Sequence, residues 1–393
     1  MSKRKPVFRP PSLAQHFEAP DDHLGYFGWL CGYSADAGFL NDAAERFTRR
    51  TAAQRAHEGR VRLAVMLDPG QPQIQPTDVP GILHLPINAE RPFRLLHAKV
   101  ALIGFRHTTE AGRWALRLIV STGNWTRETL EESLDLAWRI DITRADIDEP
   151  DDDTLRQASA DLAAAWGMLS ALRAYYDDRA LRVAPDSRPG AEPEPNTLEK
   201  WIARAARPGR EVVPRFFDNR DDSLLAQLPD LIRRHCAGSA RNYLAMGSGF
   251  FEASAPDGKI PSVLVRIADA LRRAELLTRQ PEIDVFVNPK GCQAVAGSIA
   301  AFTVAGWSVR EAGKPTCFKS ARSLHAKFLF GAICRDNSEL CNSAWLYLGS
   351  GNLTSPGFAN RMTRGGGNLE AGVVFAPESL RWEAARDTPP SAW

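Results

Sequence analysis

The stretch that decides the fold occurs twice in this chain: His97-Ala98-Lys99 followed by Asn124, and His325-Ala326-Lys327 followed by Asn352. In both copies the asparagine comes 27 residues after the histidine, and the second copy follows the first at an offset of 228 residues. Repetition at a fixed offset indicates a duplicated structural unit. Each copy supplies an imidazole, a fixed cation and an amide donor. The sequence therefore predicts two units that carry the same three functional groups.

The residues around the two copies keep the same offset. The matching pairs are Leu96 with Leu324, Thr122 with Ser350, Gly123 with Gly351, and Thr126 with Thr354. A single His-x-Lys or Gly-x-Asn occurs by chance in many chains, as a surface histidine or a turn. Two copies with equal spacing and matching flanks are much harder to explain in that way. We therefore interpret both copies as parts of one functional site.

Composition limits the class of protein. The chain has 393 residues, of which 44% are hydrophobic and 24% are charged, values that are ordinary for a globular protein of two domains or two lobes. Its net charge of +2 is too small to indicate nucleic acid or membrane binding. No apolar stretch approaches the roughly 18 residues of a membrane span, and the basic start leads into prolines rather than an apolar signal segment. We expect a cytoplasmic protein without membrane contact.

The cysteines give no sign of a metal centre. Six are present, without a Cys-x-x-Cys pair or a spacing typical of zinc sites. This pattern favours reduced, mostly buried thiols. We expect no metal and no cofactor.

The order of strands and helices predicts an α/β fold. In the first unit, strand-like runs at 26–34, 61–67 and 99–104 precede a run at 116–121 that leads into Asn124. The second unit repeats this plan with runs at 243–251, 283–289, 325–330 and 345–348, and a helix at 263–277. We expect two similar lobes, each a mixed β-sheet flanked by helices, related by a pseudo-twofold axis with one active site between them.

The lobes are expected at 1–182 and 206–393, joined by a proline-rich connector at 183–205. An amphipathic stretch at 155–176 is expected to be a helix facing the core, because its large apolar residues recur at helical spacing. The acidic run at 146–153 is most simply a solvated loop. Because both motifs lie in one chain, we expect a monomer.

The twofold His-x-Lys and (Gly/Ser)-x-Asn pattern resembles the phospholipase D superfamily, and more narrowly its tyrosyl-DNA phosphodiesterase branch. The commoner superfamily motif has an aspartate five residues after the lysine, where this chain has Gly104 and Ala332. That branch also lacks the aspartate and relies on a His-Lys-Asn triad. The resemblance implies a phospholipase D-like fold and phosphodiester chemistry.

A second likeness concerns the acidic residues behind the triads. The runs at 351–358 and 368–375 resemble the second motif of this branch and the acidic strand behind it, which contributes Glu370. In the first half the corresponding position is Asp135, where the branch tends to have an amide. By resemblance each orienting residue comes from the opposite half. This pairs Glu370 with His97 and Asp135 with His325.

The residue types suit phosphodiester cleavage. A phosphodiester repels nucleophiles, so a catalyst must neutralise the nonbridging oxygens as charge develops on them. Two lysines and two asparagines can do this without a metal. A neutral imidazole can attack phosphorus while a second, protonated imidazole donates to the leaving oxygen. By resemblance His97 is the nucleophile and His325 the acid and base. The expected catalytic residues are His97, Lys99, Asn124, Asp135, His325, Lys327, Asn352 and Glu370.

Residues beside the motifs are candidates for substrate binding. Thr122 and Ser350 precede the motif asparagines by two residues. Trp125 and Phe358, together with Phe250 and Phe251, could stack on bases of a single strand. Aromatic residues near strand ends are also common core residues, and that alternative stays open.

The function expected from these observations is metal-independent phosphodiesterase activity on DNA through a phosphohistidine. The substrate would be single-stranded DNA cut by a nuclease or an adduct released from a 3′ end. One alternative is a phospholipase D-type lipid phosphodiesterase or transphosphatidylase, against which stand the missing aspartates and the lack of an amphipathic membrane-docking segment. Another is a noncatalytic nucleic-acid-binding module, against which stand two intact triads.

Overall fold

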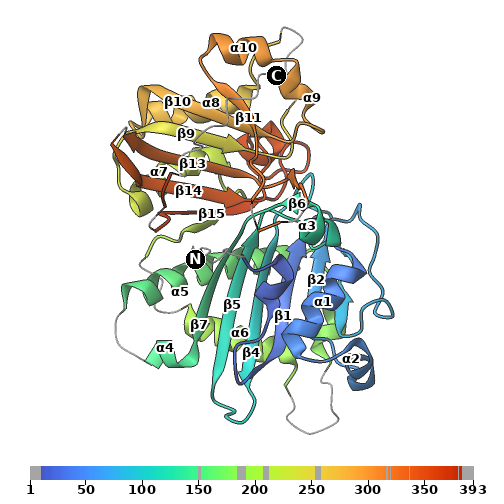
Figure 1. Cartoon of the computed structure of the whole chain (residues 1–393). Coiled ribbons are helices and arrows are strands. Elements are labelled where there is room, and N and C mark those ends of the chain that lie inside the picture. Colours follow the sequence, from blue (N-terminus) through green and yellow to red (C-terminus); the bar gives the residue numbers. More distant parts are fainter. Residues whose placement is uncertain are drawn as a thin grey trace, which may run out of the picture.

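The computed structural model describes residues 10–148, 152–183, 192–206, 212–252, 258–315, 317–318, 320–335, 337–378 and 380–382. Two lobes lie one above the other, each built on a large mixed β-sheet with helices against it (Figure 1). The predicted α/β class and the two-lobed architecture are confirmed. Among the described residues, every helix is too short or too polar to span a lipid bilayer.

The first sheet has six strands in the order β3-β2-β1-β4-β5-β7. Their bounds are β1 His23–Gly32, β2 Leu63–Leu67, β3 Ile82–His84, β4 Val100–His107, β5 Trp114–Ser121 and β7 Ala137–Thr143. β1, β2 and β3 run parallel, while β4, β5 and β7 pair antiparallel with their neighbours. Successive residues of a strand point to opposite faces. Leu30 therefore packs with α1 (Ala37–Thr48) on one face, whereas Trp29 packs with α5 (Asp153–Arg173) and α6 (Glu194–Ala205) on the other.

The second sheet has seven strands in the order β11-β10-β9-β13-β14-β15-β8. Their bounds are β8 Phe216–Asp218, β9 Arg241–Gly247, β10 Leu277–Val287, β11 Ser308–Glu311, β13 Phe328–Arg335, β14 Ser338–Gly349 and β15 Ala371–Phe375. Three parallel strands again lead into antiparallel ones. The register also repeats, since Cys31 pairs with Val100 and Gly247 pairs with Phe328, which lies 228 residues after Val100. The sheets are therefore two copies of one arrangement.

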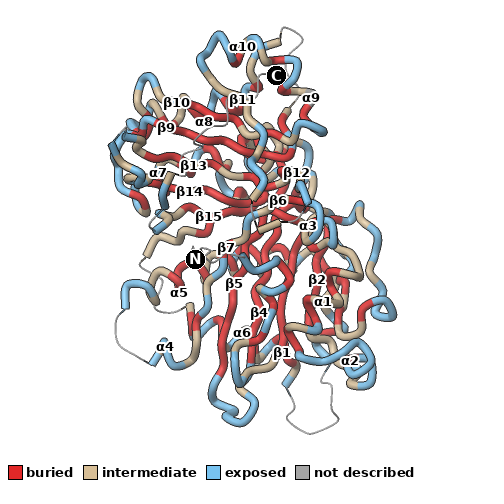
Figure 2. Tube along the Cα trace, in the orientation of Figure 1, coloured by how far each residue is buried: buried red, intermediate tan, exposed pale blue. Residues whose placement is uncertain are grey.

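Helices α7 (Leu224–Cys236) and α8 (Ser262–Arg273) pack on one face of the second sheet and form its core. The other face joins the core of the first lobe, to which it contributes Phe216, Leu348 and Val373. Figure 2 shows buried chain continuing from the first sheet into the second. The two lobes thus share one apolar core. The short helices are α2 (Ala52–Glu58), α3 (Arg127–Glu131), α4 (Arg144–Asp148), α9 (Gln293–Ala296) and α10 (Ile299–Val304).

The segment expected to connect the lobes contains a packed helix. Residues 184–191 lie outside the described part, but 194–205 form α6, which buries Leu198, Ile202 and Ala205 completely. The prolines that suggested a linker include Pro195, which sits in the first turn, where a helix tolerates it. The acidic run also differs from the expected loop in part, because α4 extends to Asp148. Most of the helix expected at 155–176 is observed as α5, which ends at Arg173.

Glycine at position 104 allows α6 to lie close to the sheet. A Cβ atom at Gly104 would lie 2.5 Å from Leu198 Cδ1 and 3.3 Å from the Trp201 ring. Trp201 also stacks on Trp114 of β5, with ring centroids 5.6 Å apart. The position where the commoner motif has an aspartate is therefore covered by a helix in this chain.

Two short backbone ladders join the lobes beside the motifs. β6 (Ser133–Leu134) pairs in parallel with β12 (Ser323–Leu324), and Leu96 forms a parallel bridge with Leu369. The Leu134 carbonyl accepts from the N–H groups of residues 325 and 326, at 3.1 and 2.8 Å. The Leu369 carbonyl accepts likewise from residues 97 and 98, at 3.0 and 2.8 Å. Each His-x-Lys segment is thus anchored to the other lobe.

Candidate active site

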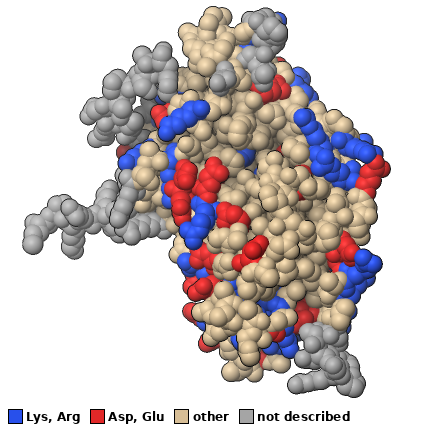
Figure 3. Space-filling view, turned by 90° about the vertical axis from the view of Figure 1, so that its right-hand side faces the viewer, with Lys and Arg blue, Asp and Glu red and all other residues tan. Residues whose placement is uncertain are grey.

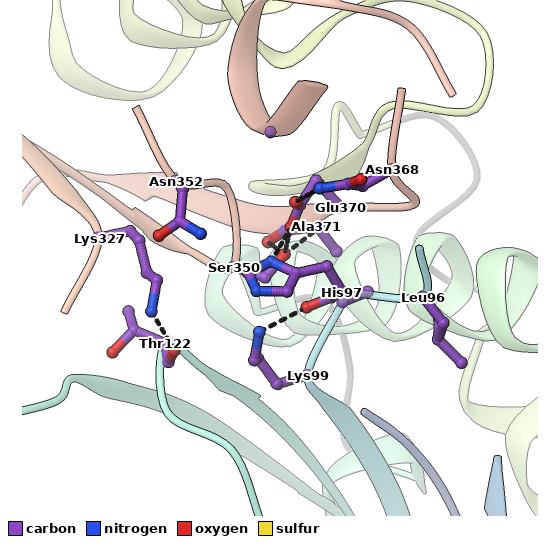
Figure 4. Close-up of polar contacts among 12 residues, drawn as sticks. Leu96, His97, Lys99, Thr122, Lys327, Ser350, Asn352, Asn368, Glu370 and Ala371 are labelled. Atoms are coloured by element: carbon purple, nitrogen blue, oxygen red, sulfur yellow. Dashed lines mark hydrogen bonds and ion pairs between the residues drawn. The ribbon is translucent and has the colours of Figure 1, made fainter. Parts of the chain in front are cut away.

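The two His-x-Lys segments project their functional side chains into one site between the lobes. In an extended segment, residues two apart share a face. His97 and Lys99 therefore point together, while Ala98 between them packs in the core. Figure 4 shows His97 and Lys99 approaching Lys327 and Asn352 of the second motif. Both triads thus contribute to one site.

His97 is held by a carboxylate of the second lobe. Its Nδ1 lies 2.9 Å from Glu370 Oε2, and the Glu370 side chain is fully buried. The Ser350 hydroxyl donates to the same oxygen, and Asn368 Nδ2 donates to Oε1 at 3.0 Å. Asn219 fixes the backbone by accepting from the Glu370 N–H at 2.8 Å. Because Nδ1 is engaged, Nε2 of His97 is the ring nitrogen left for a substrate.

His325 is held by a carboxylate of the first lobe. Its Nδ1 lies 3.0 and 3.2 Å from the two Asp135 oxygens. The Thr122 hydroxyl donates to Asp135 Oδ1 at 2.7 Å. Both crossed pairs implied by the family resemblance are therefore present as contacts, although Asp135 stands where that branch tends to have an amide.

The hydroxyls of Thr122 and Ser350 do not face a substrate. Both residues are fully buried, and each hydroxyl donates to a carboxylate. Each also accepts a backbone N–H, from Leu136 at 2.8 Å and from Ala371 at 3.0 Å. The expectation that these residues bind substrate is wrong because their hydrogen-bonding capacity is already used. They position Asp135 and Glu370 instead.

Both lysines are buried in the site. Lys99 Nζ donates to the His97 carbonyl at 2.8 Å, and Lys327 Nζ donates to the Thr122 carbonyl at 3.2 Å. Lys327 Nζ also lies 2.9 Å from His325 Nε2. Burial lowers the pKa of Lys327 to about 8, and burial together with the nearby Lys327 charge brings the pKa of Lys99 well below its usual value. Two cations in close proximity favour an anion between them.

The remaining ionisable groups have shifted pKa values with clear causes. Burial lowers the pKa of His97 to about 4, so the imidazole is neutral near pH 7. For Glu370, burial acts to raise the pKa, but the His97 contact and the Lys99 charge outweigh it and the net pKa is lowered. For Asp135, burial is likewise outweighed by the hydrogen bond and charge of His325 and by the Lys327 charge. Both carboxylates are therefore ionised.

Both motif asparagines are partly exposed. Figure 4 shows Asn352 beside Lys327. Asn352 Oδ1 accepts from Ser248 Oγ at 3.4 Å, whereas the buried Asn124 Oδ1 has no partner among the described residues. Neither amide NH₂ group donates a hydrogen bond within the described part of the chain. Both are free to donate to the nonbridging oxygens of a bound phosphate.

Two expected aromatic contacts are wrong. Trp125 is fully buried, and its Nε1 donates to the Cys31 carbonyl at 2.8 Å. Phe358 is also fully buried and packs edge-on against Tyr347, with centroids 5.3 Å apart. Both rings point into the lobe cores because the turn after each asparagine leads the chain back onto its sheet. The core alternative therefore holds for both residues, and it also holds for Phe251, which is 9% exposed.

Other aromatic residues flank the histidines. The Tyr33 ring lies 5.7 Å from the His97 ring, and the Phe250 ring lies 6.4 Å from the His325 ring at an angle of 88°. Tyr33 lies in the loop after β1, and Phe250 lies in the loop after β9. Phe250 is 54% exposed. Sequence reasoning considered Phe250 but missed Tyr33, because the duplicated pattern does not extend to this loop.

The described residues contain no group of three or more histidine, cysteine, aspartate or glutamate side chains that could hold a metal ion. Charge at the centre of the site comes from the two lysines.

Asn219 and Asn368, which support Glu370, were not predicted as site residues. Neither has a counterpart in the first half that would have marked it.

Comparison with known proteins supports the fold. No protein-family model matches the sequence, and no curated protein matches it either. Among solved structures, the yeast tyrosyl-DNA phosphodiesterase superposes with a TM-score of 0.52 and 10% identity, covering 93% of this chain and 86% of the yeast chain. A mutant of that enzyme gives a TM-score of 0.53 and 10% identity, with 92% and 84% covered. The chain therefore has the two-lobed, phospholipase D-like fold of that protein.

Proposed function

Starting from this fold, we propose that the chain is a phosphodiesterase that cleaves DNA phosphodiesters through a phosphohistidine on His97, without a metal ion. One observation carries the proposal: two histidines share a site, and the Nδ1 of each is held by a carboxylate of the opposite lobe. This arrangement leaves two Nε2 atoms for chemistry. Two buried lysines and two free amides accompany them and suit an anionic phosphate.

The first chemical step uses His97 as nucleophile. Its imidazole is neutral near pH 7, and Glu370 fixes the tautomer with the proton on Nδ1, so the Nε2 lone pair attacks phosphorus. The lysines and the amide NH₂ groups neutralise charge on the nonbridging oxygens. In the free site the Lys327 ammonium lies against His325 Nε2, and a bound phosphate competes for it. Once Lys327 has turned to the phosphate, His325 takes up a proton from solvent at Nε2, and the imidazolium donates this proton to the leaving oxygen.

The second step releases the product. Water attacks phosphorus from the side vacated by the leaving group, and His325 takes the proton of that water as a base. The bond between phosphorus and His97 Nε2 breaks, and its electron pair returns to the ring. The site is then in its starting state, with the diester hydrolysed to a monoester and an alcohol or phenol.

DNA is the favoured substrate class. The two solved structures compared above are forms of a protein named tyrosyl-DNA phosphodiesterase. Phe250 is an exposed ring beside the site that can stack on a base. Both a 3′-end adduct and an internal linkage of a strand present the required diester. Because one chain completes the site, a monomer suffices, and the cytoplasmic location remains a prediction from the sequence.

The decisive experiment is incubation in EDTA with four substrates: 3′-tyrosyl DNA, single-stranded DNA, RNA and phosphatidylcholine. The proposal requires that the protein cleaves a DNA substrate and that EDTA does not reduce the rate of cleavage. Preferred hydrolysis of phosphatidylcholine would instead show a lipid phosphodiesterase. Loss of turnover that Mg²⁺ or Zn²⁺ restores would contradict the mechanism.

Trapping the intermediate tests the assigned histidine roles. The probe is a 3′-nitrophenyl phosphodiester of a DNA strand, whose leaving group needs no proton. His325→Ala should react with it once and stall as an acid-labile phosphohistidine that carries the DNA. The adduct should migrate as a shifted band on a denaturing gel and map to His97. His97→Ala is the matched control and should form no adduct. An adduct on His325 in the His97→Ala protein would reverse the roles.

A further inference from the structure

The surroundings of the two histidines differ in a way that bears on the leaving group. Glu370 receives hydrogen bonds from His97, Ser350 and Asn368, so its charge is shared among three side-chain donors. Asp135 receives them from His325 and Thr122. Its ionised carboxylate also reaches His325 Nδ1 with both oxygens, at 3.0 and 3.2 Å. More of the Asp135 charge is thus directed at its histidine.

A carboxylate at Nδ1 stabilises the imidazolium form and orients its Nε2 proton. That support matters most when the leaving oxygen is strongly basic. A tyrosyl phenolate, with a pKa of about 10, leaves with little protonation, whereas a sugar alkoxide is far more basic and must be protonated as it departs. A charged partner behind His325 is therefore of most use for an alkoxide.

Phe250 independently marks the same side of the site. In an in-line displacement the nucleophile and the leaving group lie on opposite sides of phosphorus. With His97 attacking, the leaving group lies on the side of His325, where the Phe250 ring is 54% exposed and edge-on to the imidazole. An exposed ring there can stack on a base carried by the leaving group.

We propose that the natural leaving group is a nucleoside alkoxide, so that the reaction is cleavage of sugar–phosphate linkages within a DNA strand. This inference rests on the proposed phosphodiesterase function and specifies its substrate. In the step concerned, His97 Nε2 bonds to phosphorus as the bond from phosphorus to the sugar oxygen breaks. The electron pair goes to that oxygen, which takes the proton from His325 Nε2 and departs as an alcohol. Asp135 acts through His325 as a positioning residue.

Three thymidine 3′-phosphodiesters test the proposal. All three transfer the same thymidine 3′-phosphoryl group to His97, and they differ only in the leaving group, which is 4-nitrophenol, methanol or the 5′-hydroxyl of a second thymidine. The methyl ester and the dinucleoside are the two alkyl esters. Wild-type protein should cleave the dinucleoside with a higher kcat/KM than the methyl ester. In single-turnover experiments that follow release of the leaving group, Asp135→Asn should slow the first step about 10²-fold or more on both alkyl esters, the usual size for losing acid catalysis, and less than about tenfold on the nitrophenyl ester. Retained nitrophenyl activity shows that the variant is folded.

Two matched variants sharpen the result. Glu370→Gln acts on the nucleophile and should lower the rates of all three esters by similar factors. Asp135→Glu keeps the charge and should restore part of the alkyl-ester rate. Phe250→Ala should raise KM for the dinucleoside about tenfold, as expected for one lost stacking contact, and leave the methyl ester unchanged.

The outcomes are distinguishable. Equal losses on all three esters in Asp135→Asn would overturn the leaving-group assignment, because Asp135 would then be needed whatever group departs. A wild-type protein that cleaves the nitrophenyl ester but neither alkyl ester would overturn it too, while leaving phosphodiesterase activity intact. A wild-type protein that cleaves none of the three would contradict the proposed function itself.

Discussion

At the residue scale, the two lysines carry the largest share of the electrostatic argument. They should act as charge clamps on one phosphate, so Lys99→Ala and Lys327→Ala should each lower kcat about 10²-fold or more, as for removal of one preorganised donor. Arginine should rescue either variant poorly, because a planar fork does not fill the space of an ammonium. Steady-state kinetics on the preferred DNA substrate measures both effects.

The control is Lys200→Ala, which removes an exposed lysine on the outer helix α6 and should leave the rate unchanged. If Lys327→Ala were fully active, the second motif would not belong to the site.

The lowered lysine pKa values predict how anion binding depends on pH. Below about pH 8 Lys327 is protonated and attracts an anion, and above that pH the free site loses the charge. Sulfate keeps its own charge over this range, so its affinity should fall as pH rises from 7 to 9.5, by up to about tenfold per pH unit for each lysine that loses a proton. Calorimetry in two buffers of different ionisation enthalpy should also show proton uptake on binding above pH 8. Constant affinity across this range would contradict the assignment.

The sequence predictions that match contacts in the structure are those tied to the duplication. The crossed carboxylates contact their histidines as the family resemblance implies, while the catalytic roles of these residues stay predictions. The errors concern residues adjacent to the motifs. Thr122, Ser350, Trp125 and Phe358 lie next to site residues in the sequence, but strand alternation and the following turn direct their side chains inward. Adjacency along the chain does not reveal the direction of a side chain.

At the element scale, the close packing of α6 on β4 yields a stability prediction. Gly104→Ala should destabilise the protein by about 1–3 kcal/mol through overpacking against Leu198. Leu198→Ala should cost about 2–5 kcal/mol through the cavity it leaves. In the double variant the new methyl group occupies space freed by the leucine, so the total loss should be smaller than the sum. Urea unfolding measures all three, and strict additivity would show that the two side chains do not touch.

The same elements show how far sequence patterns reach. Every strand predicted from an apolar run overlaps an observed strand, because buried strands need such runs. The short edge strands β3, β8 and β11 were missed, since three or four residues give too little pattern. The seven-residue edge strand β7 was missed as well. The helix α6 was missed because the prolines of this segment predicted a connector, although Leu198, Ile202 and Ala205 have the spacing of a helix face.

At the scale of the whole molecule, the shared core predicts cooperative unfolding. The apolar cluster of the first lobe includes residues of β8, β14 and β15, so neither sheet keeps its core if the other unfolds. The buried Asp161 of α5 also pairs with Arg215 beside β8, at 2.7 Å. Differential scanning calorimetry should therefore give one transition whose van't Hoff and calorimetric enthalpies agree. Two resolved transitions would show that the lobes unfold independently.

Surface charge offers little help in attracting DNA. On the face drawn in Figure 3, acidic and basic side chains are interspersed, in keeping with a net charge of +2. Affinity for a strand must then come mainly from the site itself, and it should depend less on salt than in proteins with an extended basic surface.

The crossed carboxylates also constrain how such a molecule could have arisen. A single lobe holds a histidine and a lysine but lacks the acidic partner of that histidine, which comes from the other lobe. An ancestor with one lobe would therefore have been functional only as a twofold dimer of identical chains, in which the carboxylate of each chain contacts the histidine of the other. Fusion of two such genes would have let the halves diverge. One histidine then has a glutamate that an amide supports, and the other has an aspartate partner and an exposed ring as its neighbour.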